Sequence, residues 1–97
     1  MEESFEWDPL KDLLNQMKHG VSFETAKKAF HDPRFVVVED STHSTKESRY
    51  HCYGKVDGRI LTVRFTWRGK LIRIIGAGYW RYGRRYYEEK SSLHGRP

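Results

Sequence analysis

The sequence has too little cysteine and too few apolar runs for several large classes of protein. Cys52 is the only cysteine among 97 residues, so the chain can form no internal disulfide and no cysteine-based zinc cluster. No apolar run approaches the roughly 20 residues that span a bilayer. The chain starts with the acidic segment Met1-Glu2-Glu3, where a secretory or transit signal would be basic. We therefore expect a cytoplasmic protein that does not enter a membrane.

Motifs for metals and nucleotide cofactors are also missing. The five histidines, His19, His31, His43, His51 and His94, show neither His-x-x-x-His nor paired Cys/His spacing. The chain contains no Gly-rich phosphate loop of the Walker type and no Gly-x-Ser-x-Gly nucleophile elbow. The sequence thus predicts no metal site and no cofactor.

Positive charge is present, and it is concentrated in one half of the chain. Lys and Arg outnumber Asp and Glu by 18 to 13, which gives a formal net charge of +5. Residues 1–50 hold 7 basic and 10 acidic side chains, whereas residues 51–97 hold 11 basic and 3 acidic ones. The C-terminal half is therefore expected to face a polyanion or an acidic partner.

Hydrophobic periodicity predicts an α+β domain. Asp8-Pro9 opens an amphipathic helix over about 9–18, Gly20 ends it, and Ser22 opens a second helix that stops before Pro33. The period then changes to two, with strands expected at 35–39, 47–54, 59–68 and 71–75, and a hairpin turn at Asp57-Gly58. Helical spacing returns over 79–90. We predict one domain, residues 1–90, with two short N-terminal helices, a four-stranded antiparallel sheet and a C-terminal helix, followed by a disordered tail at 91–97.

Arginines alternate with apolar residues on the predicted strands. In the strand 59–68, one face is apolar and the other presents Thr62, Arg64, Thr66 and Arg68, while Arg49 and Arg73 lie on the neighbouring strands. Such a face is either a phosphate-binding surface or a solvated face balanced by carboxylates. The segment 79–87 adds five aromatic rings and three arginines, a mixture that suits single-stranded RNA. Alternatively, some of these rings are core residues; DNA major-groove binding is disfavoured because the rings are bulky.

Several short motifs resemble those of the BrnT toxin family. The matching segments run in order over residues 5–88, namely Phe5-x-Trp7-Asp8-Pro9-x-Lys11, Asn15, Lys18-His19-Gly20-Val21-Ser22-Phe23-Glu24, Phe30-x-Asp32-Pro33, His43-Ser44-x-x-Glu47-x-Arg49, Gly58-Arg59-x-Leu61-x-Val63-x-Phe65-Thr66, Arg73-Ile74-Ile75 and Arg84-x-x-Tyr87-Glu88. The resemblance implies a RelE-like ribonuclease toxin of a type II toxin–antitoxin pair. It also implies a partner, a BrnA-like antitoxin of the ribbon-helix-helix type. The toxin would contact DNA only indirectly, through this antitoxin.

One segment departs from the family pattern. Family members commonly carry a serine and an arginine after the fourth strand, where this chain has Gly76-Ala77-Gly78. If that arginine stabilises the cleaved phosphate in other members, its loss would cost about a hundred- to a thousand-fold in rate. Either an arginine of the following helix replaces it, or the protein is a weakened RNA- or antitoxin-binding module without turnover.

The resemblance and the residue types together predict a metal-independent endoribonuclease that inhibits translation. The 2′-hydroxyl of RNA would attack the adjacent phosphate, which requires a base, an acid and fixed positive charge. The catalytic candidates are Arg64, Arg73, His19, Lys18 and Glu47. The candidates for RNA binding are Lys11, Arg49, Arg81, Arg84, Arg85 and Tyr82.

Overall fold

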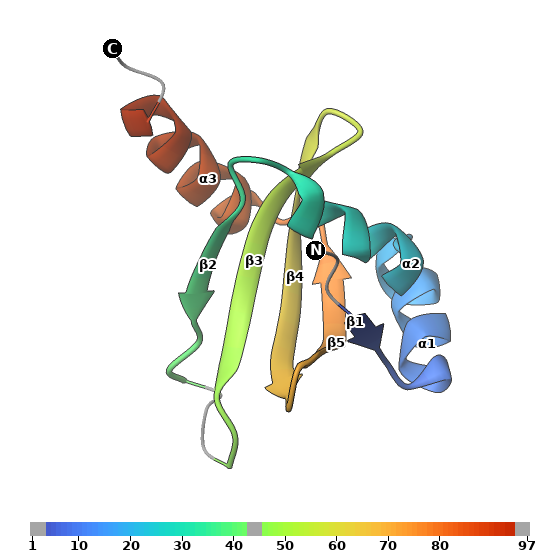
Figure 1. The fold of residues 1–97 in the computed structure, drawn as a ribbon. Coiled ribbons are helices and arrows are strands. Elements are labelled where there is room, and N and C mark those ends of the chain that lie inside the picture. Colours follow the sequence, from blue (N-terminus) through green and yellow to red (C-terminus); the bar gives the residue numbers. More distant parts are fainter. Residues whose placement is uncertain (1–3, 43–45, 95–97) are drawn as a thin grey trace.

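The computed structural model describes residues 4–42 and 46–94. The motif residues His43 and Ser44 therefore lie outside the described part of the chain. The elements, in chain order, are β1 (Ser4–Glu6), α1 (Pro9–His19), α2 (Phe23–Ala26), the 3₁₀ helix η1 (Lys27–His31), β2 (Val36–Glu39), β3 (Arg49–Val56), β4 (Arg59–Arg68), β5 (Leu71–Gly78) and α3 (Arg81–His94) (Figure 1).

The elements form one five-stranded mixed sheet with helices around it. The strand order is β1-β5-β4-β3-β2; strands β2 to β5 pair antiparallel, and β1 pairs parallel with β5. The α+β class is confirmed, but the predicted four-stranded antiparallel sheet is wrong. The additional strand forms because Phe5 packs its ring edge-to-face against Phe30 at 5.3 Å, while Glu6 forms an ion pair with Arg73.

Three other element boundaries differ from the prediction. Strand β5 does not break at residue 76, because Gly76, Ala77 and Gly78 remain paired with β4. The predicted second helix is a four-residue α-helix that tightens into η1. Helix α3 starts at Arg81 and continues through His94, four residues beyond the predicted end of the domain; residues 95–97 of the predicted tail lie outside the described chain.

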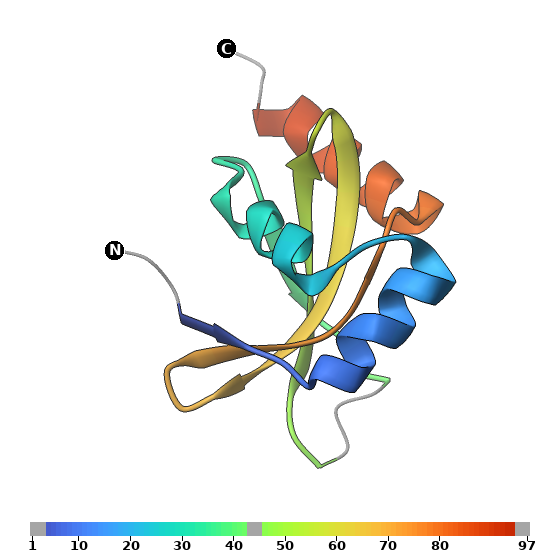
Figure 2. The ribbon, with the colours of Figure 1, turned by 90° about the vertical axis from the view of Figure 1, so that its right-hand side faces the viewer.

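Each face of the sheet carries its own hydrophobic cluster. Helices α2 and η1 cover one face and α3 covers part of the other (Figure 2). The larger cluster lies under α2 and η1 and includes Phe23, Phe30, Leu61 and Phe65. Cys52 belongs to it, and burial raises the pKa of its thiol, as expected for a packing residue. The smaller cluster lies under α3 and contains Tyr53, Ile60 and Tyr87.

Asp32 fixes α3 relative to the rest of the domain. Its Oδ2 accepts hydrogen bonds from the hydroxyl of Tyr87 on α3 and from the backbone amide of Lys55 on β3. Its Oδ1 accepts from the amide of Arg34. Burial opposes ionisation of this carboxyl, but the three hydrogen bonds outweigh it and lower its pKa. The middle of α3 is thereby held beside the β3–β4 hairpin.

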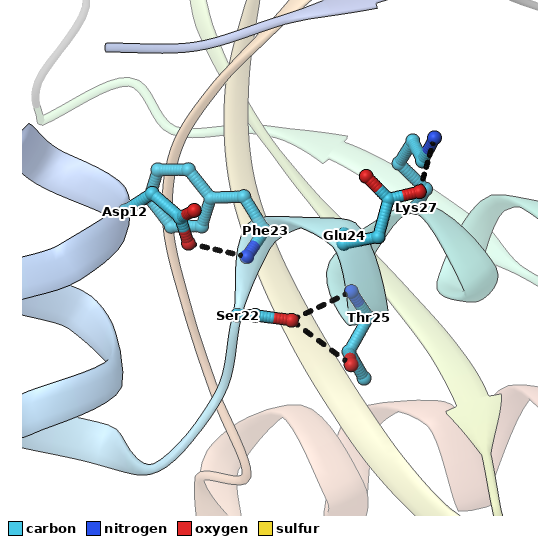
Figure 3. A network of polar contacts seen from close by, with 6 residues as sticks. All are labelled: Asp12, Ser22, Phe23, Glu24, Thr25 and Lys27. Carbon is cyan, nitrogen blue, oxygen red and sulfur yellow. Dashed lines mark hydrogen bonds and ion pairs between the residues drawn. The ribbon is translucent and has the colours of Figure 1, made fainter. Parts of the chain in front are cut away.

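Polar contacts, and not its apolar side chains, attach α1 to the domain. Asp12 accepts a hydrogen bond from the amide of Phe23 at 2.8 Å, and Ser22 caps α2 through the amide of Thr25 at 3.0 Å (Figure 3). The apolar side of the helix stays largely in solvent, with exposed fractions between 52% and 75% at Leu10, Leu13, Leu14 and Met17. The predicted amphipathic helix exists, but its apolar side lies outside the core.

Asn15 is the buried residue that joins α1 to β5. Its Nδ2 donates to the carbonyls of Val21 and Ala77 at 2.9 Å, and its Oδ1 accepts from the amide of Ala77 at 3.1 Å. The backbone carbonyl and amide of Ala77 lie at the edge of β5, beyond the point where β1 ends, and Asn15 gives both of them hydrogen-bond partners. The side chain therefore replaces a missing neighbouring strand.

We expect Asn15→Ala to lower the free energy of unfolding by about 2 to 4 kcal/mol, because it leaves buried backbone groups of Val21 and Ala77 without partners. Urea denaturation measures the change. The matched control is Gln16→Ala, which removes an exposed amide on the same helix and should change stability by less than about 0.5 kcal/mol. Equal stabilities of the two variants would contradict this role of Asn15.

Candidate functional site

The predicted arginines share the sheet face that α3 leaves partly open. Arg64 on β4 lies directly opposite His51 on β3 and Gly76 on β5. Two residues along β4, Thr66 lies opposite Arg49 and Arg73. Because directly opposed residues, and residues two apart on a strand, point to the same side of a sheet, all of these residues lie on one face, where the arginines form a surface. The alternation in the sequence predicted this face correctly, but Thr62 and Thr66, which were expected to point into solvent, are buried.

Arg64 occupies the middle of that surface. Its side chain is exposed and forms no ion pair within residues 4–42 and 46–94. Its Cζ lies 5.9 Å from the centroid of the Trp80 ring. The β4–β5 pairing has an irregular register between Arg64 and Phe65, and such bulges re-aim neighbouring side chains. Arg73 differs, because its Nη1 lies 3.1 Å from Glu6 Oε2.

A small cavity beside Arg64 brings together residues of three elements. Arg49, Arg64, His51 and Asp40 are among its lining residues. His51 Nε2 lies 3.3 Å from Asp40 Oδ2, and its Nδ1 lies 3.3 Å from the hydroxyl of Tyr53. Burial is the main cause that raises the pKa of Tyr53 to about 12, so this phenol keeps its proton at neutral pH. Both ring nitrogens of His51 thus face protein groups. The ring therefore forms part of the wall of the cavity that Arg49 and Arg64 line.

The sequence prediction overlooked His51, although the sequence contained a signal for it. The two-residue turn Asp57-Gly58 fixes the register of the β3–β4 hairpin, with Val56 opposite Arg59. Counting back along both strands from this turn places His51 opposite Arg64.

His19 lies at the junction of α1 and α3. Its ring meets the ring of Trp80 edge-to-face, with centroids 5.1 Å apart. His19 and Arg64 therefore contact the same indole. Lys18, the preceding residue, is exposed at the end of α1, and Lys11 is exposed in its first turn. Two of the predicted catalytic residues, His19 and Arg64, thus lie around the ring of Trp80. Trp80 itself was not among the predicted site residues.

Glu47 lies away from this group. It forms an ion pair with Arg68, with Arg68 Nε 3.3 Å from Glu47 Oε1. Arg68 is four residues along β4 from Arg64, which corresponds to about 13 Å at the usual rise per residue of a strand.

A groove of 660 Å³ lies between the β3–β4 hairpin and the start of α3. Of the arginines predicted on the C-terminal helix, Arg81 and Arg84 line it. Arg85 and Tyr82 are exposed on α3 but do not line the groove. The sequence prediction missed the contributions of Lys55, Arg59 and Tyr79, because only the fold brings the hairpin to the helix.

The family model described as the ribonuclease toxin, BrnT, of type II toxin–antitoxin systems matches residues 7–82. The chain belongs to the BrnT family. No curated protein matches it. As a type II toxin of this family, it has RNA as its substrate and an antitoxin as its partner.

The described part of this BrnT-family toxin contains neither a membrane-spanning helix nor a metal-binding cluster of side chains. No helix in the described part of the chain is long and apolar enough to cross a membrane. Among residues 4–42 and 46–94, no three His, Cys, Asp or Glu side chains are grouped so that they could hold a metal ion.

Gly76 and Gly78, where the toxin departs from the common family pattern, have a physical explanation in the structure. A Cβ at Gly76 would lie 3.0 Å from Arg64 Cζ and Nε, and a Cβ at Gly78 would lie 2.5 Å from two carbons of the Trp80 indole. The glycines therefore form a flat floor on which these two side chains lie. Trp80 occupies the space that a longer side chain at position 78 would need.

Gly76→Ala is a probe of the Arg64 position that changes no charge. The added methyl group meets the flexible end of Arg64 and not the backbone, so we expect little change in melting temperature. We expect the rate of RNA cleavage to fall about tenfold or more, because a small displacement of a positioned catalytic group is costly. Cleavage assays and thermal unfolding of the variant measure the two effects. Unchanged cleavage would show that Arg64 does not act from the position seen here.

Proposed function

We propose that this BrnT-family toxin is a metal-independent endoribonuclease that arrests translation by cutting RNA. The observation that carries the proposal is the exposed Arg64 guanidinium, which has no carboxylate partner in the described chain and lies beside Trp80, the ring that His19 also contacts. Attack of a 2′-hydroxyl on the neighbouring phosphate builds negative charge on the phosphoryl oxygens. A fixed arginine stabilises that charge without a bound metal ion.

Each side chain around Arg64 has a role in this mechanism. Arg64 and Arg49, which line one cavity, bind the phosphate that is attacked. His19 either takes the proton from the attacking 2′-hydroxyl or donates a proton to the leaving 5′-oxygen, and Lys18 is the neighbouring candidate for these transfers. Trp80 offers a ring on which an unpaired base stacks.

The more distant charged residues act on the RNA strand. Arg73 adds positive charge to the same face although it is paired with Glu6. Glu47 orients a cation, since it is paired with Arg68. Lys11, Arg81, Arg84, Arg85 and Tyr82 extend the surface on which the strand lies.

The antitoxin and the location of the toxin belong to the same proposal. Cytoplasmic RNA is the target, so the toxin acts in the cytoplasm. We propose that its antitoxin is a ribbon-helix-helix protein of the BrnA type, and that the pair reaches operator DNA only through this partner. An acidic or amphipathic segment of the antitoxin would neutralise the toxin by covering the arginine face.

Incubation of the purified toxin with a defined RNA, with and without EDTA, tests the proposal. We expect cleavage products of equal amount in both reactions, and arrest of protein synthesis when the toxin is induced in cells without its antitoxin. RNA binding that weakens steeply with salt but yields no products would instead identify a binding module without turnover. Cleavage that EDTA abolishes would contradict metal independence.

A further inference from the structure

The groove between the β3–β4 hairpin and α3 has the size and lining of a ligand site. Its volume of 660 Å³ falls within the range of about 300 to 1,000 Å³ that is typical of small-ligand pockets. Two elements form its walls. The hairpin contributes Lys55 and Arg59. Tyr79 and Trp80 come from the segment just before α3, and Arg81, Arg84 and Glu88 come from α3 itself.

The groove carries a surplus of positive charge. Four of its lining residues are cationic and one, Glu88, is acidic. Within the described residues, Arg59, Arg81 and Arg84 take part in no ion pair. The groove also contains the first turn of α3, whose free backbone amides add positive potential. Unpaired arginines and a helix start in one concave site favour an anionic ligand, and arginine forks match phosphate oxygens.

Aromatic rings line the same groove. The guanidinium of Arg59 lies over the Tyr79 ring, with Cζ 3.8 Å from the centroid. This contact holds a flat cationic group against a flat ring at the wall of the groove. Trp80 lines the groove as well. A nucleobase stacks on such planar groups, whereas a simple phosphate or an acidic peptide makes no use of them.

Trp80 connects the groove to the face of the sheet that carries Arg64. The indole lines the groove and lies 5.9 Å from Arg64 Cζ. A strand whose phosphate is bound at Arg64 therefore needs to cross one indole to place its next nucleotide in the groove. The two sites are thus spaced for neighbouring positions of one chain.

We propose that the groove is a nucleotide subsite that binds an unpaired residue of the RNA next to the phosphate held by Arg64. The base stacks against Trp80 and the Arg59–Tyr79 pair, and the phosphate of this nucleotide is bound by Arg81 and Arg84. The subsite rests on the proposed ribonuclease function, because it places the RNA relative to the cleaved bond. It selects single strands, since a base inside a duplex cannot enter the groove.

Binding of an uncleavable RNA tests the subsite separately from cleavage. The probe is a fluorescent, fully 2′-O-methylated single strand of about 12 nucleotides, which lacks the attacking hydroxyl. The test variant is Arg59→Ala combined with Arg84→Ala. The control with the same loss of charge is Lys28→Ala combined with Lys70→Ala, since both lysines are exposed and lie outside the groove and the arginine face.

We expect the test variant to bind the probe about tenfold more weakly and the control variant to bind within about twofold of the wild type. Loss of the phosphate contact of Arg84 should also reduce the slope of log affinity against log salt by about 0.7. In cleavage assays, KM should rise for the test variant while kcat stays near the wild-type value. Duplex RNA of the same length should compete poorly.

Three outcomes would overturn the subsite. They are equal weakening in the test and control variants, tighter binding of free mononucleotides than of the single strand, and equal binding of duplex and single strand. If the wild type binds as expected but cuts no RNA, the subsite stands and the proposed ribonuclease activity fails.

Discussion

Arg64→Ala is expected to lower the rate of RNA cleavage about a hundred- to a thousand-fold, the usual cost of removing one positioned donor to a charged transition state. The guanidinium is exposed at the middle of the sheet face, has no ion-pair partner among residues 4–42 and 46–94, and Gly76 leaves room for it. Removing it deletes positive charge where the pentavalent phosphate forms. Binding of RNA should weaken far less, because other cations remain. Single-turnover cleavage of a defined RNA measures the loss.

The fold of the variant should be unaffected, since the side chain is exposed and carries no ion pair within the described chain. Its melting temperature should lie close to that of the wild type. Arg34→Ala removes another exposed arginine, just before β2, and its cleavage rate should stay within about twofold of the wild type. If Arg64→Ala cuts RNA as fast as Arg34→Ala, the assigned role of Arg64 is wrong.

His19→Ala should lower cleavage about a hundred- to ten-thousand-fold, the usual contribution of a general acid or base. The ring ends α1 and rests edge-on against Trp80, 5.1 Å between centroids, so it faces the indole that Arg64 also contacts. Added imidazole should restore part of the lost rate, because the small molecule can enter the space left by the ring. A purely structural role of His19 would not be rescued in this way.

His31→Ala is the matched control, since this histidine is exposed at the end of η1. It should cut RNA at close to the wild-type rate, with no response to imidazole. Loss of activity in His19→Ala that imidazole leaves unchanged would contradict proton transfer by His19. It would assign that step to Lys18, which Lys18→Ala then checks.

Local sequence signals were enough to predict most elements of this fold. Asp8 and Gly20 do bound α1, with the Asp8 side chain accepting from the amide of Leu10 and Gly20 at a φ of 70°. The turn Asp57-Gly58 does join β3 and β4. Strand β1 was not part of the predicted sheet, because its three residues carry almost no periodicity and its partner, β5, lies more than sixty residues away in the sequence.

The site was predictable to the extent that it follows strand alternation. The alternation placed Arg64 on an outward face, and the hairpin register could have added His51. Trp80 and the groove could not be predicted, because they depend on how α3 crosses the sheet, which Asp32 and Tyr87 fix through a long-range hydrogen bond. In the sequence, Gly76 and Gly78 looked like the loss of a functional serine and arginine. Only the side-chain positions show that they make room for Arg64 and Trp80.

The chemical nature of the RNA ends produced by the toxin tests the central claim most directly. A defined RNA cut in the presence of EDTA should yield fragments with a 2′,3′-cyclic phosphate on one side and a 5′-hydroxyl on the other, because the 2′-hydroxyl is the attacking group. Mass spectrometry of the products distinguishes these ends from others. Fragments with a 3′-hydroxyl and a 5′-phosphate, or the absence of fragments whenever EDTA is present, would contradict the account.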